Sequence, residues 1–143
     1  MIDMKNLLLV TALMVTVSGR GFSEQGNKAG KMKAMAVAYF DEERLRNLGR
    51  QAELDNFRYF LKPIGEIVKR DFPGVELKIV GRGELVRLPD GTKLNVQNVD
   101  PALGIILTAR GKKRRLLSGV QTDFDFACAA ASFYQRPSPA CNK

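Results

Sequence analysis

The chain has 143 residues, of which 45% are hydrophobic and 27% are charged, as in an ordinary globular domain rather than a disordered chain. Lysine and arginine number 23 against 15 aspartates and glutamates, which gives a basic protein with a formal net charge of +8. Because histidine is absent, no Ser-His-Asp or Cys-His nucleophile and no imidazole zinc ligand can form. We therefore expect no catalytic residues, metal or cofactor, and favour a binding protein over an enzyme that works with carboxylates, lysines, tyrosines or hydroxyls.

An uncharged apolar run, residues 6–17, follows Lys5 near the N-terminus. It is shorter than the roughly 20 apolar residues that cross a bilayer. A positive start, an apolar stretch and small residues at its end are typical of a secretory signal peptide, with cleavage after Gly19 or Ser23. The sequence predicts a signal peptide at residues 1–19 and export to the periplasm or the medium, with no stable membrane span after cleavage. A core helix and an uncleaved anchor are the alternatives.

Residues 20–34 are rich in Gly, Ser, Gln, Asn and Lys and are predicted to be a flexible leader, followed by one globular domain at residues 35–143. The apolar residues 35–40 fit either a short strand or the approach to a helix, since so short a run does not separate the two. Asp41 is a candidate N-cap, and the two glutamates after it are favoured by the helix dipole.

The strongest helical pattern is an apolar stripe with spacings of three and four residues, which predicts one buried face of an amphipathic helix. Pro63 either kinks this helix or begins a second one. Residues 71–74, Asp-Phe-Pro-Gly, end it. The stripe is expected to pack in a core rather than to line a ligand groove. It consists of Leu54, Phe57, Leu61, Ile64 and Val68.

Beyond residue 74 the pattern changes to the alternation of short strands. The predicted strands are residues 75–79, 84–88, 92–97, 104–109 and 114–118. The turns between them include Gly81-Arg82-Gly83 and Pro89-Asp90-Gly91, and the continuous apolar run 104–109 predicts a central strand buried on both faces. A last, nearly apolar helix is predicted from the N-cap Thr122 to about Tyr134.

These elements predict an α+β fold. Because the links between strands are short, we expect an antiparallel meander of about five strands. A long N-terminal helix and a short C-terminal helix are expected to pack on it.

Two cysteines, Cys128 and Cys141, enclose 12 residues of the C-terminal segment. In an oxidising compartment such a pair is expected to form a structural disulfide, with two free thiols as the alternative. The spacing is not CxxC, and two thiols without histidine make a poor metal site.

Part of the chain resembles a thioredoxin-like domain. Pro101 precedes a strand, Gly111-Lys112 marks a hairpin, and a helix closes the chain; Pro63 in a helix before a strand is similar to that family's kinked helix. The resemblance covers the last two-thirds of the chain and implies a thioredoxin-like α/β fold. Residues 55–58, Asp-Asn-Phe-Arg, stand where a CxxC would lie before the kink, so the implied alternative lacks dithiol chemistry.

The sharpest functional feature is a basic hairpin, residues 110–115, in a window from residue 101 to 122 without an acidic residue. Its cations are Arg110, Lys112, Lys113, Arg114 and Arg115. Such a cluster attracts an acidic protein or an anionic polymer. Nucleic acid is the less favoured partner, because no aromatic residue lies between Pro101 and Gln121 to stack on bases. The alternative is a solvated turn without a partner.

Overall fold

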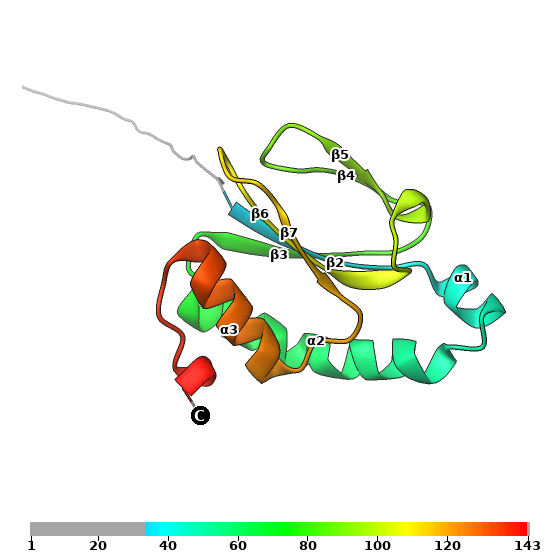
Figure 1. Ribbon diagram of the computed structural model, residues 1–143, viewed down its shortest axis with the longest axis horizontal. Coiled ribbons are helices and arrows are strands. Elements are labelled where there is room, and N and C mark those ends of the chain that lie inside the picture. The colour runs from blue at the N-terminus through cyan, green and yellow to red at the C-terminus, as the bar shows by residue number, and fades with distance from the viewer. Residues whose placement is uncertain (1–33, 143) are drawn as a thin grey trace, which may run out of the picture. The chain divides into compact units, whose positions relative to one another are not determined.

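The computed structural model describes residues 34–142 (Figure 1), so the predicted signal peptide and nearly all of the leader lie outside it. The helices and strands are, in chain order, β2 (Ala34–Phe40), α1 (Glu42–Asn47), α2 (Gln51–Asp71), β3 (Val75–Val80), β4 (Leu85–Arg87), β5 (Lys93–Asn95), β6 (Leu103–Ala109), β7 (Arg115–Ser118) and α3 (Asp123–Tyr134). Two short 3-10 helices follow β5 and α3, η1 (Val96–Asn98) and η2 (Pro139–Asn142).

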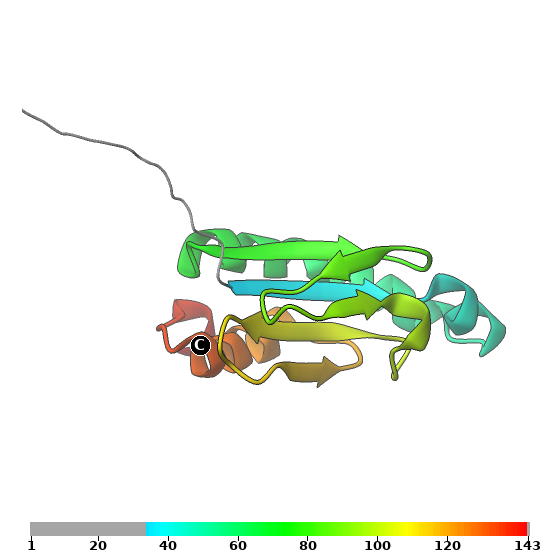
Figure 2. The ribbon, with the colours of Figure 1, turned by 90° about the horizontal axis from the view of Figure 1, so that it is seen from above.

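A four-stranded sheet with the order β3-β2-β6-β7 forms the middle layer of the domain. β2 pairs in parallel with β3 and antiparallel with β6, and β6 pairs antiparallel with β7. The helices α2 and α3 lie on one face of this sheet, and the two-stranded hairpin β4–β5 lies over the other (Figures 1 and 2). The fold is therefore mixed α and β, as predicted, in three layers.

β2 occupies the centre of the sheet, which settles the open choice for residues 35–40 in favour of a strand. Its five inner residues, Met35 to Tyr39, are all buried, so both faces of the strand are covered. Parallel strands need a long crossover connection, and α1 and α2 supply it between β2 and β3. The predicted antiparallel meander is therefore wrong for its first strand, residues 75–79, which pairs in parallel with β2, and the long helix follows a strand instead of leading the domain.

The turn at Gly81-Arg82-Gly83 forms, but it does not join a hairpin, because β4 pairs with β5 and not with β3. The chain leaves the sheet there and crosses its face, where Val86, Leu88 and Leu94 pack against the sheet. The alternation in β4 and β5 reflects this one buried side. Sequence alternation identifies the buried face of a strand but not its partner, which is why the meander prediction failed.

The helix face of the sheet holds the larger core. All five residues of the predicted stripe are buried there, so the amphipathic prediction for α2 is confirmed. α2 runs as one helix through Pro63, which rules out a second helix beginning at that proline. β6 is buried along almost its whole length, as expected for the central strand, and α3 packs its Phe126, Ala127 and Ala130 into the same core.

The C-terminal segment is attached to the domain by a disulfide between Cys128 of α3 and Cys141 of η2, with a Cα–Cα distance of 4.7 Å. The disulfide prediction is confirmed, and the alternative of two free thiols is not. Ser138, just before η2, donates to an Asp71 carboxylate oxygen at 2.7 Å at the end of α2. The last described residues, up to Asn142, are therefore held to both helices.

The disulfide predicts a stability difference. Replacing both cysteines, C128A/C141A, releases a loop of 12 residues and is expected to lower the free energy of unfolding by about 3 kcal/mol in the chain-entropy model. Urea unfolding of parent and variant measures this. Mass spectrometry of the native protein after alkylation, without reduction, should find no modified cysteine; two alkylated thiols would contradict the assignment.

A second prediction concerns the stability of a Gly104 variant, because β6 and β7 approach closely at this residue. A β carbon on Gly104 would lie 2.8 Å from the Leu117 carbonyl oxygen and 3.2 Å from the Tyr39 hydroxyl. We expect G104A to lose about 2 kcal/mol in urea unfolding, since backbone must move to accommodate the methyl group. The matched control is G65A in α2, whose β carbon would meet only Leu77 Cδ2 at 3.6 Å. Its expected effect is neutral or stabilising by up to about 1 kcal/mol, and equal losses in the two variants would refute the assignment.

Candidate functional site

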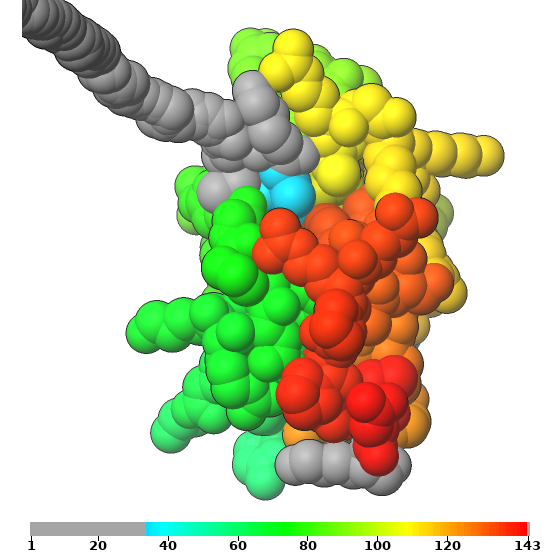
Figure 3. Space-filling view, turned by 90° about the vertical axis from the view of Figure 1, so that its left-hand side faces the viewer, coloured from blue at the N-terminus to red at the C-terminus, as the bar shows by residue number. Residues whose placement is uncertain are grey.

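The basic hairpin predicted from the sequence, residues 110–115, joins β6 to β7 at one edge of the sheet. The Lys112 amide donates to the Ala109 carbonyl at 3.2 Å, and Gly111 supplies the positive φ of 75° that the tight turn needs. In Figure 3 the hairpin region, in yellow, forms the upper right of the visible face and borders α3, in orange to red. The predicted turn is confirmed, and one of its cations, Lys112, contacts the last turn of α3.

Lys112 fastens the hairpin to the helix layer. Its ammonium group donates to the Phe133 carbonyl oxygen, in the last turn of α3, and lies 4.7 Å from the centre of the Phe133 ring. A positive charge is favoured at the C-terminal end of a helix and over the face of an aromatic ring. Lys112 thus has its partner inside the domain and attaches the hairpin to α3.

Arg114 fastens the hairpin to the opposite layer. Its guanidinium forms an ion pair with Asp90 in the turn between β4 and β5, at 2.9 Å from the Oδ2 atom, and also contacts the Thr92 hydroxyl. Asp90 accepts from the Thr92 hydroxyl at 2.6 Å and from the Thr92 amide at 3.0 Å. The Thr92 hydroxyl chiefly, with help from its amide and Arg114, outweighs desolvation and lowers the pKa of Asp90, so the carboxylate is charged at neutral pH.

The other three hairpin cations, Arg110, Lys113 and Arg115, point to solvent. None of them has a carboxylate oxygen within ion-pair distance among residues 34–142. The structure thus divides the predicted site into two cations with partners inside the domain, the exposed Lys112 and the half-buried Arg114, and three exposed cations without a carboxylate partner there. Sequence reasoning treated all five alike, because the anchoring partners lie more than 20 residues away.

Beside β7 an open groove of about 420 Å³ runs between this strand and α3. It is lined by Arg115, Leu117, Gln121, Asp125, Cys128, Ala129 and Ser132. Arg115 therefore borders both solvent and the groove. The groove begins at the basic hairpin and carries one acidic residue, Asp125, in the first turn of α3.

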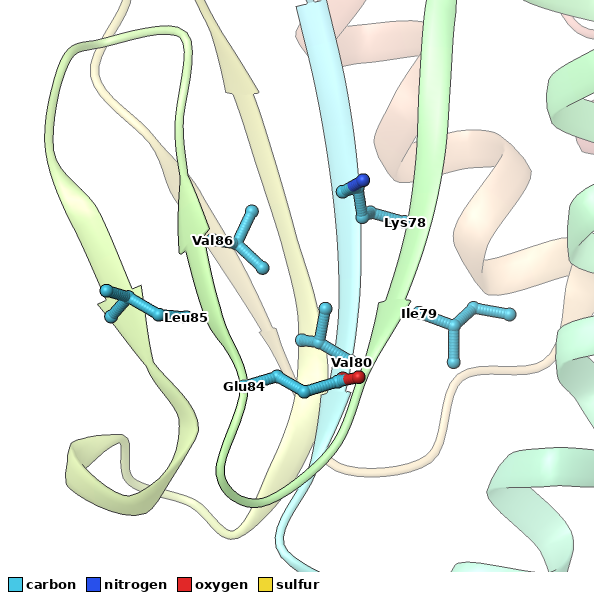
Figure 4. Close-up of a pocket in the computed structure, with 6 residues that line it drawn as sticks. All are labelled: Lys78, Ile79, Val80, Glu84, Leu85 and Val86. Atoms are coloured by element: carbon cyan, nitrogen blue, oxygen red, sulfur yellow. The ribbon is translucent and has the colours of Figure 1, made fainter.

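A second groove of about 330 Å³ lies between β3 and β4, and Figure 4 shows its six lining residues. They are Lys78, Ile79, Val80, Glu84, Leu85 and Val86. Glu84 already accepts from the Gly81 amide at 2.7 Å, and the Lys78 ammonium lies 3.8 Å from Glu76. With its charged groups engaged in this way, the groove offers no set of residues for chemistry.

An ion pair that sequence reasoning missed, between a buried carboxylate and a partly exposed arginine, lies at the carboxyl end of β2. Asp41 is only 1% exposed, and both of its carboxylate oxygens accept from Nη1 of Arg82, at 3.0 and 2.9 Å. It also accepts from the Arg44 amide at 3.2 Å, which confirms its predicted role as the N-cap of α1. The partner Arg82 belongs to the Gly81-Arg82-Gly83 turn, and no local signal links residues 41 positions apart.

Further contacts extend this pair into a network at the same end of the sheet. Arg82 Nε lies 3.1 Å from Glu43, and Arg44 Nη1 lies 3.3 Å from Asp100, which precedes Pro101 in a cis peptide bond. The Tyr39 hydroxyl donates to the Pro101 carbonyl at 2.9 Å. Burial raises the pKa of Tyr39 to about 12, so it stays protonated. The network joins three loops and holds no free nucleophile or base.

Asp41 is ionised within this network. Burial of the carboxylate opposes its ionisation, but the Arg44 amide and the Arg82 guanidinium outweigh burial and hold the pKa of Asp41 below its ordinary value. At neutral pH Asp41 therefore stabilises the fold as a carboxylate, and it carries no proton to donate.

Residues 34–142 contain no group of three or more side chains able to hold a metal ion. In the same range no helix has the length and apolar character needed to cross a membrane. No family model matches the chain, and comparisons with curated proteins and with solved structures give no significant match.

Asp41 predicts a pH-dependent stability. Since its folded pKa lies below its unfolded value of about 3.9, ionised Asp41 stabilises the fold above that pH, and the stabilisation is lost as the pH falls through the folded pKa. D41N keeps an N-cap but loses the charge, so we expect it to lose about 2 kcal/mol near neutral pH. Urea unfolding at neutral pH and near pH 3 should show a smaller difference in acid.

The matched control for D41N is E43Q, which removes the exposed second carboxylate from the same arginine. An exposed ion pair contributes little, so its loss should be much smaller than that of D41N. A D41N deficit that is independent of pH, or equal to that of E43Q, would contradict the assignment.

Proposed function

We propose that this protein is a small exported binding or inhibitory protein that contacts an acidic or anionic partner through its basic hairpin. One observation carries the proposal. The hairpin is held in place by Lys112 and Arg114, while Arg110, Lys113 and Arg115 remain exposed without a carboxylate partner among the described residues. Cations without internal partners on a fastened loop form a surface suited to an anionic ligand.

The two anchors, Lys112 and Arg114, are expected to raise the affinity for a partner by ordering the hairpin before binding. Binding costs free energy when flexible loops and side chains must be ordered, and a loop already attached at both sides pays less of that cost. The arginines can form paired hydrogen bonds with a carboxylate or phosphate, whereas Lys113 acts as a point charge. We therefore place the contact on the three exposed cations, with Lys112 and Arg114 as positioning residues.

The class of partner follows from the surroundings of the hairpin. No acidic residue lies between residues 101 and 122, so the nearest sequence neighbours do not neutralise it. The same window holds no aromatic side chain for base stacking, so an acidic protein or an anionic envelope polymer is favoured over nucleic acid. Export is supported by the N-terminal sequence pattern and is compatible with the disulfide.

For the scaffold we propose a thioredoxin-like α/β fold without dithiol chemistry. Several described features support the resemblance: Pro101 precedes β6, a Gly-Lys hairpin joins β6 to β7, α3 closes the domain, and α2 contains Pro63 before β3. Residues 55–58, in place of a CxxC, lie within α2, and both cysteines are joined to each other near the C-terminus. A redox-inactive domain of this kind is compatible with a binding function.

The proposal is tested by neutralising the three exposed cations. We expect R110Q/K113Q/R115Q to weaken binding to immobilised polyglutamate by about tenfold or more near neutral pH, because the attraction is carried by these charges. The control K62Q/K69Q/K78Q makes the same change in net charge on α2 and β3 and should bind nearly as the parent. Equal weakening in both variants would show that net charge, not the hairpin, governs binding.

Salt tests the nucleic-acid alternative. Binding of single-stranded DNA through phosphate contacts falls steeply with salt, so we expect its affinity to be lost between low and moderate ionic strength. A partner captured from envelope or secreted fractions that stays bound at moderate salt, and is released by the hairpin variant, supports the acidic-protein proposal. Capture that the hairpin variant leaves unchanged refutes the hairpin as the contact.

A further inference from the structure

Among residues 34–142, β7 has one unpaired edge. It is the last strand in the order β3-β2-β6-β7 and pairs with β6, with Ile105 opposite Leu117. The Gly119 amide donates to the Leu103 carbonyl at 3.2 Å, which identifies the odd-numbered residues of β7 as those bonded to β6. Because an antiparallel ladder alternates, the backbone groups of Leu116 and Ser118 face outward. Gln121 Nε2 donates to the outward Ser118 carbonyl at 3.0 Å, as this alternation requires.

The two sides of this edge differ in character. Leu116, 41% exposed, lies on the face that carries the β4–β5 hairpin, where its Cδ1 atom would be 3.4 Å from a β carbon on Gly104. Arg115 and Leu117 lie on the other face and line the groove against α3. A strand added to this edge would therefore meet an apolar contact on one face and a cation on the other.

The charge around β7 indicates what kind of strand can add to its free edge. Arg115 begins β7, and Arg110 and Lys113 lie in the turn just before it, so the start of the edge is strongly positive. A second copy of the chain has no acidic residue along its own β7 edge, so pairing two copies there would leave the cations of both hairpins without a carboxylate partner. The opposite edge strand, β3, carries Glu76 and Lys78, and so both signs of charge. An acidic extended segment complements β7 better than a second copy does.

We infer that an acidic, extended segment of a protein partner adds to β7 as a fifth strand of the sheet. This inference rests on the proposed function and names the form of its partner. Main-chain hydrogen bonds to Leu116 supply affinity, and acidic side chains over Arg115 supply specificity, as in other cases of strand addition. Apolar or β-branched side chains at the alternate positions cover Leu116.

The probe for this inference is a short, end-capped, fluorophore-labelled peptide of alternating Glu and Val residues, titrated with the full, disulfide-intact chain and followed by fluorescence anisotropy. Two further peptides carry backbone N-methyl groups on all Glu or on all Val residues. A strand presents only one edge to β7, so one methylated peptide is expected to bind about tenfold more weakly and the other nearly as the parent. Equal affinities of all three peptides would overturn strand addition.

A protein variant gives a second measurement. L116P removes the outward amide of β7 without removing a bond to β6, a place where an edge strand tolerates proline. Its matched control, L116A, keeps the amide and shortens the side chain. We expect L116P to weaken peptide binding by about tenfold and L116A by less. If L116P does not fold, the methylated peptides still decide the question, since they need only the parent protein.

The outcomes separate this inference from the proposed function. In one outcome R110Q/K113Q/R115Q no longer binds the Glu-Val peptide, but L116P binds it as the parent protein does and both methylated peptides bind like the unmethylated one. Binding is then purely electrostatic, so the proposed function stands and strand addition is overturned. If R110Q/K113Q/R115Q binds all peptides as the parent does, the proposed function fails. A dimer in sedimentation that L116P dissociates would overturn the acidic segment in favour of a second copy.

Discussion

The burial of β2 on both faces is the constraint on which the rest of the domain depends. A strand with five consecutive buried residues needs cover above and below the sheet and a partner on each side. The helices cover one face, and the small β4–β5 hairpin covers the other with only a few apolar residues. The parallel pairing with β3 follows from the same position, since α1 and α2 must cross from the end of β2 to the start of β3.

The basic hairpin is built on this layered plan. Lys112 attaches it to the helix layer, and Arg114 attaches it to the β4–β5 layer, so one turn is tied to both sides of the sheet. Two of the five hairpin cations therefore have partners inside the domain and hold the turn in position. The other three cations lie on the turn that these two contacts hold, so the proposed contact depends on the anchors.

Sequence reasoning succeeded where the signal is local. The stripe of α2, the buried run of β6, the caps at Asp41 and Thr122 and the disulfide all follow from spacing or from short-range chemistry, and the structure contains each of them. It failed where the determinant is a distant partner. The alternation in residues 84–88 indicates one buried side of the strand but not which layer covers it. The sequence around Asp41 contains no pattern that predicts its contact with Arg82. The sequence does not show which hairpin cations have internal partners, for the same reason. Asp90 and Phe133 lie more than 20 residues from the cations that they contact.

The network around Asp41 has a consequence for the molecule as a whole. β6 runs from that network to the basic hairpin, so the two sets of charges lie at opposite ends of the sheet (Figure 1). At one end Arg44 and Arg82 are matched by Asp41, Glu43 and Asp100, and at the other three cations are unmatched among the described residues. Of the charges in these two sets, the unmatched positive charge therefore lies at the hairpin end of the strands. An acidic surface would attract this unmatched set more strongly than the matched set around Asp41, which favours an approach by the hairpin end.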